Sequence, residues 1–208
     1  MWSYWESKFR NGGALWSFEP SDSAIIALEI LKKSGFSNIL IPGIGYARNA
    51  KLFLDAGIKV TGIEIAESAI NVARINGIDC TIHHGSVTSM PFDNEVYDAV
   101  FCFALLHLLN KNERQYFLKS CFNHLRNNGL MIFVVSSKKM DLYGKGKYLS
   151  KDRFEIESGL KVFFYDQDSI IKEFSPFGPV DFKEIDEPVK FMKEVDPLKL
   201  YYVVCRKT

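Results

Sequence analysis

Short apolar runs alternate with longer stretches of helical periodicity through most of the chain. A short apolar run between turn signals predicts a buried strand, and apolar residues that recur every three to four positions predict a helix. The pattern predicts strands at 38–41, 59–65, 79–84, 97–103 and 130–136, and helices at 23–34, 47–56, 67–76 and 111–126. Since crossovers between parallel strands are right-handed, this order predicts an α/β sandwich of three layers with a mostly parallel sheet.

Both ends of the chain depart from this alternation. An aromatic segment at 1–20 precedes the first helix, whose N-cap is expected at Ser21 or Asp22. After a turn expected at 127–129 and the strand that follows it, a basic insert with tyrosines occupies 137–160. A helix is then expected at 168–174, and strands at 180–185 and 199–205 complete a sheet of seven strands.

Composition agrees with one compact domain spanning residues 1–208. The 26 Lys and Arg residues nearly balance the 25 Asp and Glu residues, which argues against a dedicated nucleic-acid binder. The four cysteines are widely spaced and are expected to be buried free thiols. We find no signal peptide and no apolar run long enough to span a bilayer, so we expect a soluble, cytoplasmic protein without a membrane partner.

Candidate chemistry begins at the end of the first strand. Gly43 and Gly45 make a tight turn that leaves bare backbone beside a ligand, and Glu64 ends the next strand. Glu64 follows the glycines by about 20 residues, the spacing at which a carboxylate accepts both hydrogens of a ribose diol. The pattern therefore predicts a nucleoside site, although an ordinary strand-to-helix connection would use the same glycines.

The identity of the nucleoside depends on the residues that follow the glycines. A dinucleotide fingerprint has Gly or Ala where this chain has Arg48, which disfavours a nicotinamide-dependent oxidoreductase. The segment resembles the first motif of class I S-adenosylmethionine (SAM) methyltransferases, and the sequences after Glu64 and at 97–103 continue the resemblance. In that family the last strand runs antiparallel into the sheet, and Pro42, Gly43 and Gly45 with the pair Arg48-Asn49 would cradle the amino-acid end of SAM.

The same resemblance implies further cofactor contacts at the ends of other strands. Ile65 follows Glu64, and Ser86 stands where the family usually has an acidic residue that bonds the adenine amino group. Val87 would present its backbone N–H to the adenine ring. Phe103 and Ala104 would lie beside the transferable methyl group.

His107 is the candidate catalytic residue, because it lies in the turn after the fourth predicted strand. It would act as a general base for a hydroxyl or a protonated amine, whereas a thiol or a neutral amine needs no base. Packing at a helix start is the alternative role for His107. The other histidines lack metal-ligand spacing, so no metal site is expected.

The acceptor side is less defined. The N-terminal segment with Trp5 and Trp16 resembles small-molecule methyltransferases of the thiopurine and tellurite-resistance type, in which it folds over the ligand; packing on the first helix is the alternative. Tyr143, Tyr148 and Arg153 of the basic insert are candidate acceptor contacts, unless the insert is a solvated loop. The leading hypothesis is a methyltransferase for a small molecule. An RNA or protein methyltransferase and a non-catalytic SAM-binding module are the alternatives.

Overall fold

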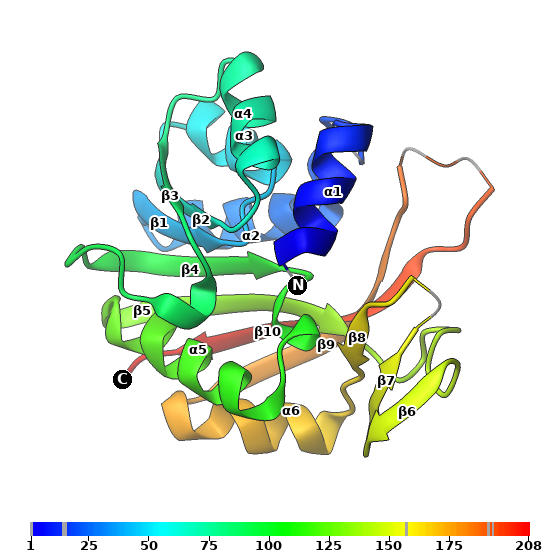
Figure 1. The fold of residues 1–208 in the computed structure, drawn as a ribbon. Coiled ribbons are helices and arrows are strands. Elements are labelled where there is room, and N and C mark those ends of the chain that lie inside the picture. The colour runs from blue at the N-terminus through cyan, green and yellow to red at the C-terminus, as the bar shows by residue number, and fades with distance from the viewer. Residues whose placement is uncertain (1, 14–15, 157, 191, 193) are drawn as a thin grey trace.

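A computed structural model describes residues 2–13, 16–156, 158–190, 192 and 194–208. Its main sheet has seven strands in the order β3-β2-β1-β4-β5-β10-β9 (Figure 1). The strands are β1 (Asn38–Pro42), β2 (Lys59–Glu64), β3 (Thr81–His84), β4 (Tyr97–Phe103), β5 (Leu125–Ser136), β9 (Val180–Glu187) and β10 (Leu198–Arg206). β1 to β5 pair in parallel, whereas β10 is antiparallel to both of its neighbours, β5 and β9. The predicted seven-stranded sheet is confirmed.

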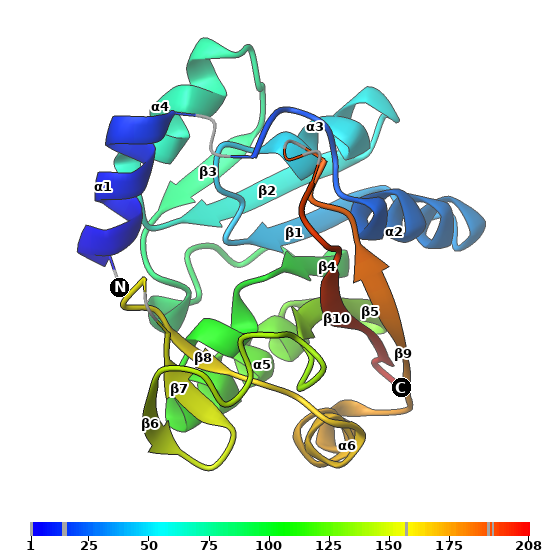
Figure 2. The ribbon, with the colours of Figure 1, turned by 90° about the vertical axis from the view of Figure 1, so that its right-hand side faces the viewer.

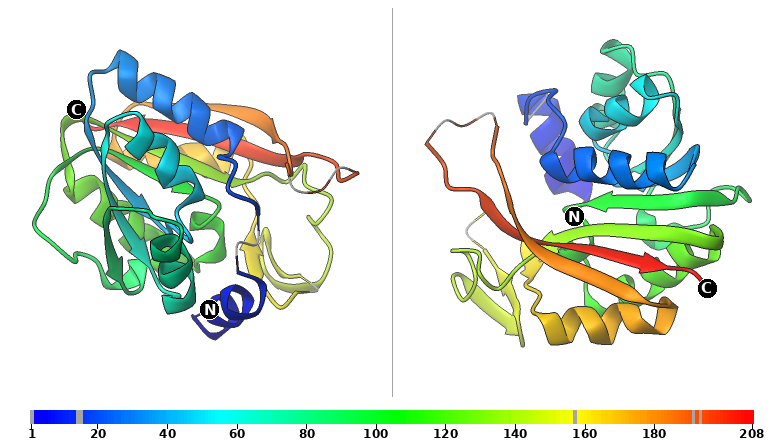
Figure 3. Two further views of the ribbon diagram at one scale, coloured as in Figure 1. Left: turned by 90° about the horizontal axis from the view of Figure 1, so that it is seen from above. Right: turned by 180° about the vertical axis from the view of Figure 1, so that it is seen from behind.

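Helices cover both faces of this sheet (Figures 1 and 3). They are α1 (Trp2–Gly12), α2 (Asp22–Lys33), α3 (Arg48–Asp55), α4 (Glu67–Ile75), α5 (Lys111–Asn123) and α6 (Gln167–Phe174), with 3-10 turns η1 (Val87–Ser89), η2 (Leu106–Leu108) and η3 (Ser175–Phe177). Successive strand residues point to opposite faces, so Ile39 and Ile41 pack in the core under α2 and α3, while Leu40 packs in the core with α5 and α6. This burial on both faces explains the continuous apolar runs.

The boundary between α5 and β5 differs from the prediction. α5 ends at Asn123 and β5 begins at Leu125, so the residues expected to form a turn lie inside the strand. Leu125 pairs with Tyr97, and the register then shifts before Leu130 pairs with Ala99. Asn128 has φ +63° at this irregularity. The Asn-Asn-Gly signal therefore marks a bulge within a strand rather than a turn before one.

The N-terminal segment, expected to precede the first regular element, contains helix α1 (Figure 2). The i, i+4 spacing of Trp5 and Phe9 places both rings on one face, where Phe9 is buried. The Glu6 carboxylate accepts hydrogen bonds from the N–H of Ser68 (3.1 Å) and from its hydroxyl (2.5 Å). Because α4 lacks a local side-chain cap, Glu6 serves as its cap and fastens α1 to α4.

The insert folds as a small antiparallel sheet instead of a solvated loop. Its strands are β6 (Lys147–Ser150), β7 (Arg153–Glu155) and β8 (Lys161–Phe163), and the last one lies just beyond the predicted insert boundary. Val162 and Phe164 pack on Leu108 of η2. Lys138 forms ion pairs with Asp152 (2.9 Å) and Asp166 (2.6 Å), which fix the start of the insert.

We predict that Gly62→Ala destabilises the sheet, because a Cβ at Gly62 would lie 2.5 Å from Cδ1 of Ile44. Overpacking of this kind costs about 1–3 kcal/mol of unfolding free energy. Ile44→Ala removes this Cδ1 atom and also Cγ2, which would lie 2.8 Å from the new Cβ, so the double variant should be less destabilised than the sum of the two single changes. Urea unfolding of the four proteins measures this coupling, and strict additivity would contradict the packing argument.

Candidate active site

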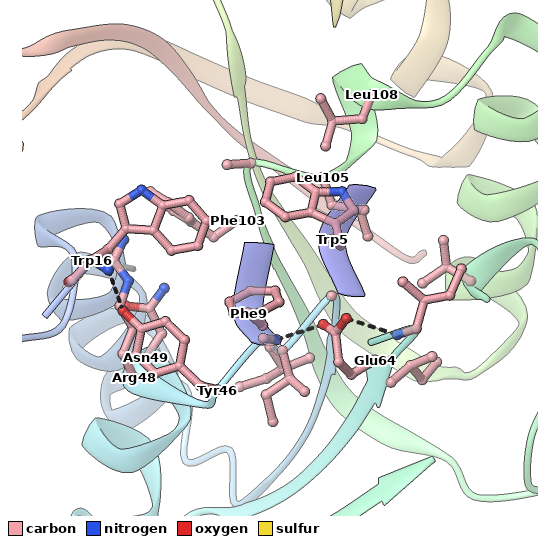
Figure 4. A pocket seen from close by; sticks show the side chains of 18 of the residues that line it. Trp5, Phe9, Trp16, Tyr46, Arg48, Asn49, Glu64, Phe103, Leu105 and Leu108 are labelled. Carbon is pink, nitrogen blue, oxygen red and sulfur yellow. Dashed lines mark hydrogen bonds between the residues drawn. The ribbon is translucent and has the colours of Figure 1, made fainter. Parts of the chain in front are cut away.

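A cavity of about 460 Å³ opens at the carboxyl ends of the parallel strands (Figure 4). Its walls combine loops that follow β1, β2, β3 and β4 with the N-terminal segment and the β9–β10 connection, residues 188–197. The predicted residues that line it are Trp5, Trp16, Gly43, Gly45, Arg48, Asn49, Glu64, Ile65, Ser86, Val87, Phe103 and Ala104. Pro42 is buried in β1 and does not line the cavity.

The loop after β1 is shaped by residues with positive φ. Gly43 and Gly45 have φ +69° and +60°, and a Cβ at Gly43 would lie 2.9 Å from Cδ2 of Leu105. Ala47, just before α3, also adopts φ +65°. Ala47 is therefore the third residue of this loop with a conformation that favours glycine. It lies one residue before Arg48, which occupies the third Gly position of the dinucleotide fingerprint.

Glu64 connects this loop to the loop after β2 (Figure 4). One carboxylate oxygen accepts a hydrogen bond from the Gly45 N–H (2.9 Å), and the other accepts from the N–H groups of Ile65 (2.9 Å) and Ala66 (2.8 Å). Only 6% of Glu64 is exposed, and burial raises its pKa while the three N–H donors oppose that shift. A carboxylate has about four lone-pair positions, so the side chain retains acceptor capacity for a hydroxyl pair.

Aromatic rings form the wall next to this loop. The Tyr46 hydroxyl donates to the Ser17 carbonyl (2.6 Å) and accepts from the Trp16 N–H (2.9 Å), and the Trp16 and Tyr46 rings are stacked. Phe9 lies edge-on to both rings. Sequence reasoning singled out the two tryptophans for the cavity but missed Phe9 and Tyr46. Their signals were the i, i+4 pair in α1 and the aromatic residue within the glycine turn.

Arg48 is the cation of this wall. Its guanidinium lies 5.5 Å from the Phe103 ring centroid and donates long hydrogen bonds (3.4 Å) to the carbonyls of Trp16 and Glu19. Burial lowers the pKa of Arg48. Its neighbour Asn49 accepts a hydrogen bond from the Ser21 N–H (2.9 Å). Arg48 is therefore available to an anionic group, whereas the Asn49 oxygen already bonds the segment before α2.

The remaining predicted cofactor residues lie at the next two strand ends. Ser86 caps the η1 turn by accepting a hydrogen bond from the Thr88 N–H (3.2 Å), and Val87 is buried behind it. Ala104 has φ +56°, which turns the chain away from β4 so that Leu105 faces the glycine loop.

His107 lies outside the cavity lining and is buried. Its Nδ1 atom accepts a hydrogen bond from the Ser136 N–H (3.1 Å), so the proton of the neutral ring is on Nε2. Burial, together with the charge of Arg114, lowers the pKa of His107 to about 4. A ring whose only basic nitrogen is already bonded does not fit the general-base role, and the geometry favours the packing alternative.

The insert residues expected to bind the acceptor also lie outside the lining. Tyr143 packs edge-on to Phe154 and donates a hydrogen bond to Asp152 (2.8 Å). Tyr148 is 65% exposed, and Arg153 is half-buried in the insert sheet. The insert sheet instead packs behind two residues of the cavity wall, because its apolar cluster includes Leu108 and contacts Trp5.

The β9–β10 connection is the wall that sequence reasoning did not find. Its residues in the lining are Pro188, Val189, Lys190, Met192 and Val195, and Glu187 and Leu198 flank it. These positions are far in sequence from the glycine turn, and their only local signal is a set of apolar residues in a hairpin connection.

Within the described ranges, no group of three His, Cys, Asp or Glu side chains is arranged to hold a metal ion, and no helix is long and apolar enough to cross a membrane.

Comparison with known proteins agrees with this geometry. Residues 39–129 match the family model of a methyltransferase domain, which spans β1 to the start of β5. No curated protein matches the sequence significantly. The matched stretch contains the glycine turn after β1 and Glu64, so the residues that resemble a methyltransferase motif in the sequence are also the residues that the family model covers.

Several solved structures share the fold at low sequence identity. The 1,6-didemethyltoxoflavin-N1-methyltransferase of Burkholderia thailandensis, with bound 1,6-didemethyltoxoflavin and S-adenosylhomocysteine (SAH), is 18% identical with a TM-score of 0.73, over 100% of this chain and 87% of that one. A possible histamine N-methyltransferase of Thermotoga maritima is 19% identical with a TM-score of 0.69, over 100% of both chains. A SAM-dependent methyltransferase of Clostridium acetobutylicum is 12% identical with a TM-score of 0.68, over 99% and 98%.

The buried His107 predicts a specific pH dependence of stability. The unfolded chain binds a proton at this ring below about pH 6.5, whereas the folded chain binds it only below about pH 4. The contribution of the neutral His107 ring to the unfolding free energy is therefore fully present above pH 6.5. It falls as the pH drops towards 4, by on the order of 3 kcal/mol.

His107→Asn keeps an acceptor for the Ser136 N–H, because its Oδ1 atom is as far from Cβ as the Nδ1 atom it replaces, but it cannot titrate. Urea unfolding at pH 7.5 and pH 4.5 should show a larger loss of stability for the wild type than for this variant. Equal losses in the two proteins would contradict the assigned pKa.

Proposed function

We propose that this protein is a SAM-dependent methyltransferase, which transfers a methyl group from SAM to a small, largely apolar acceptor. The observation that carries the proposal is the cavity itself. Its volume of about 460 Å³ is within the usual range of small-molecule sites, roughly 300–1,000 Å³, and its lining is mainly aromatic and aliphatic.

The residues at one end of the cavity fit the cofactor. Glu64 offers a carboxylate to the ribose, the bare backbone of Gly43 and Gly45 allows close approach, and Arg48 is available to the carboxylate of the amino-acid part. Ser86 and Val87 lie at the neighbouring strand end for the adenine. When bound, SAM supplies a methyl group that is already activated by the sulfonium charge.

The other part of the cavity is the proposed acceptor end. Its wall consists of Trp5, Trp16, Leu105, Leu108 and the β9–β10 connection. In this proposal the side chains align the acceptor and exclude water, which is the main requirement of a direct displacement. Because the His107 imidazole is bonded to Ser136, the acceptor atom would attack with a lone pair of its own, as a thiolate or neutral amine does.

The alternative of an RNA or protein acceptor rests on the basic insert. Two of its lysines are already paired, Lys138 with Asp152 and Asp166, and Lys139 with Glu184. Lys145, Lys147 and Lys151 remain exposed, but none of them lines the cavity. These contacts favour the small-molecule proposal over an RNA or protein acceptor. A turnover screen with SAM over thiols, amines, phenols and carboxylates tests the proposal directly. SAM binding without turnover of any acceptor would favour a non-catalytic module.

We predict that Glu64→Gln weakens the binding of SAH by about 1–3 kcal/mol in calorimetry. The amide would direct an N–H group at a backbone N–H donor, and the charged acceptor for the ribose would be lost. Glu67→Gln is the matched control, because this exposed carboxylate begins α4 only three residues away. Equal SAH affinity for both variants and the wild type would remove Glu64 from the cofactor site.

We further predict that the insert takes no part in cofactor binding. The double charge reversal Lys145→Glu, Lys147→Glu should leave the SAH affinity unchanged within twofold, because both residues lie outside the cavity lining. A 20-nucleotide single-stranded RNA should bind the wild type with a Kd weaker than about 100 µM at physiological salt, the weak limit of non-specific binding. Tighter, salt-dependent binding that the double variant loses would favour an RNA acceptor.

A further inference from the structure

Glu187, the last residue of β9, binds the N-terminal turn of α2. Only 3% of this residue is exposed, and its carboxylate accepts hydrogen bonds from the N–H groups of Asp22 (2.8 Å) and Ser23 (3.0 Å) and from the Ser23 hydroxyl. α2 already has a local cap in Ser21, whose side chain accepts from the Ala24 N–H. Glu187 therefore supplies a second, charged cap from the opposite end of the chain, at the positive end of the helix dipole.

Lys190 makes a second attachment to the same turn. Its ammonium group pairs with the Asp22 carboxylate (2.7 Å) and donates a hydrogen bond to the Pro20 carbonyl (2.9 Å). The β9–β10 connection is thus fixed at its start by two oppositely charged side chains. Beyond this point it places Met192 and Val195 in the cavity lining although they are 51% and 48% exposed.

The segment that receives these contacts, residues 16–23, also holds the cofactor end. Tyr46 bonds Trp16 and Ser17, and Asn49 bonds the Ser21 N–H. The charge of Glu187 also acts on Arg48, where it opposes the lowering of the pKa by burial. One short segment therefore joins the residues that follow Gly45 to the connection that borders the acceptor end (Figure 2).

We propose that Glu187 and Lys190 are positioning residues, which hold the β9–β10 connection over the acceptor end and couple it to the cofactor end through residues 16–23. The proposal rests on the proposed function, since it assigns this wall to the acceptor. A ligand that orders the glycine loop also orders segment 16–23, and the connection attached to that segment then presents a fixed apolar wall. Cofactor and acceptor should therefore bind with positive coupling.

The test uses SAH for the cofactor end and the fluorescent apolar anion 1-anilinonaphthalene-8-sulfonate for the acceptor end. In the wild type, saturating SAH should tighten binding of the dye by about fivefold or more, the lower bound of ordinary coupling. Glu187→Gln and Lys190→Met should each reduce this factor to less than twofold when each variant is saturated with SAH, so that a change in SAH affinity itself does not alter the factor. Hydrogen exchange of residues 188–197 should become faster in both variants, and that of residues 43–49 should not change.

Asp186→Asn is the matched control, because it removes the exposed Asp186–Lys199 ion pair (2.8 Å) from the same hairpin without touching α2. It should retain wild-type coupling and exchange. Full coupling in Glu187→Gln and Lys190→Met, or unchanged exchange of residues 188–197, would overturn the proposal. If SAH does not bind the wild type, the cofactor assignment fails, while exchange in the free protein still decides whether Glu187 and Lys190 fix the connection.

Discussion

The cavity depends on one buried carboxylate. Glu64 accepts three backbone N–H groups, one from the loop after β1 and two from the loop after its own strand, so the ends of two neighbouring strands are fixed relative to each other. These N–H groups would otherwise be unpaired donors in a buried site, which is costly. The same contacts direct the bare backbone of Gly43 and Gly45 and the remaining acceptor capacity of Glu64 into one space.

Two further carboxylates attach the outer walls to this centre by the same means. Glu6 caps α4 and thereby fastens α1, whose Trp5 and Phe9 line the cavity, and Glu187 caps α2 and thereby anchors the β9–β10 connection. Both bind the N-terminus of a helix near the proposed cofactor end, where free N–H groups and the helix dipole favour a negative charge. The walls are therefore held by charge-assisted hydrogen bonds at the rim, which leaves the inner lining to apolar groups.

The distribution of charge in the cavity agrees with the proposed methyl transfer, in which alignment of the reactants is the main requirement. Glu64 and Glu187 use their oxygens to bind backbone, Lys190 is paired with Asp22, and Arg48 stacks on Phe103. In the proposed reaction, an apolar lining would exclude water from the sulfonium centre and strengthen the few polar contacts that remain. The wall near Trp5 and Leu108 receives its support from the insert sheet, so the insert contributes to the shape of the cavity without lining it.

The sequence by itself determined the sheet, the glycine loop and the position of Glu64, because each depends on local constraints: apolar periodicity, backbone conformations that favour Gly, and a carboxylate at a strand end. Only the tertiary structure decided which partner each isolated polar side chain binds. His107 accepts from the Ser136 N–H, the insert tyrosines lie outside the cavity lining, and Glu187 binds a helix 165 positions earlier. A local pattern specifies an acceptor or a donor, but the packing of distant elements determines which partner lies within hydrogen-bond distance of it.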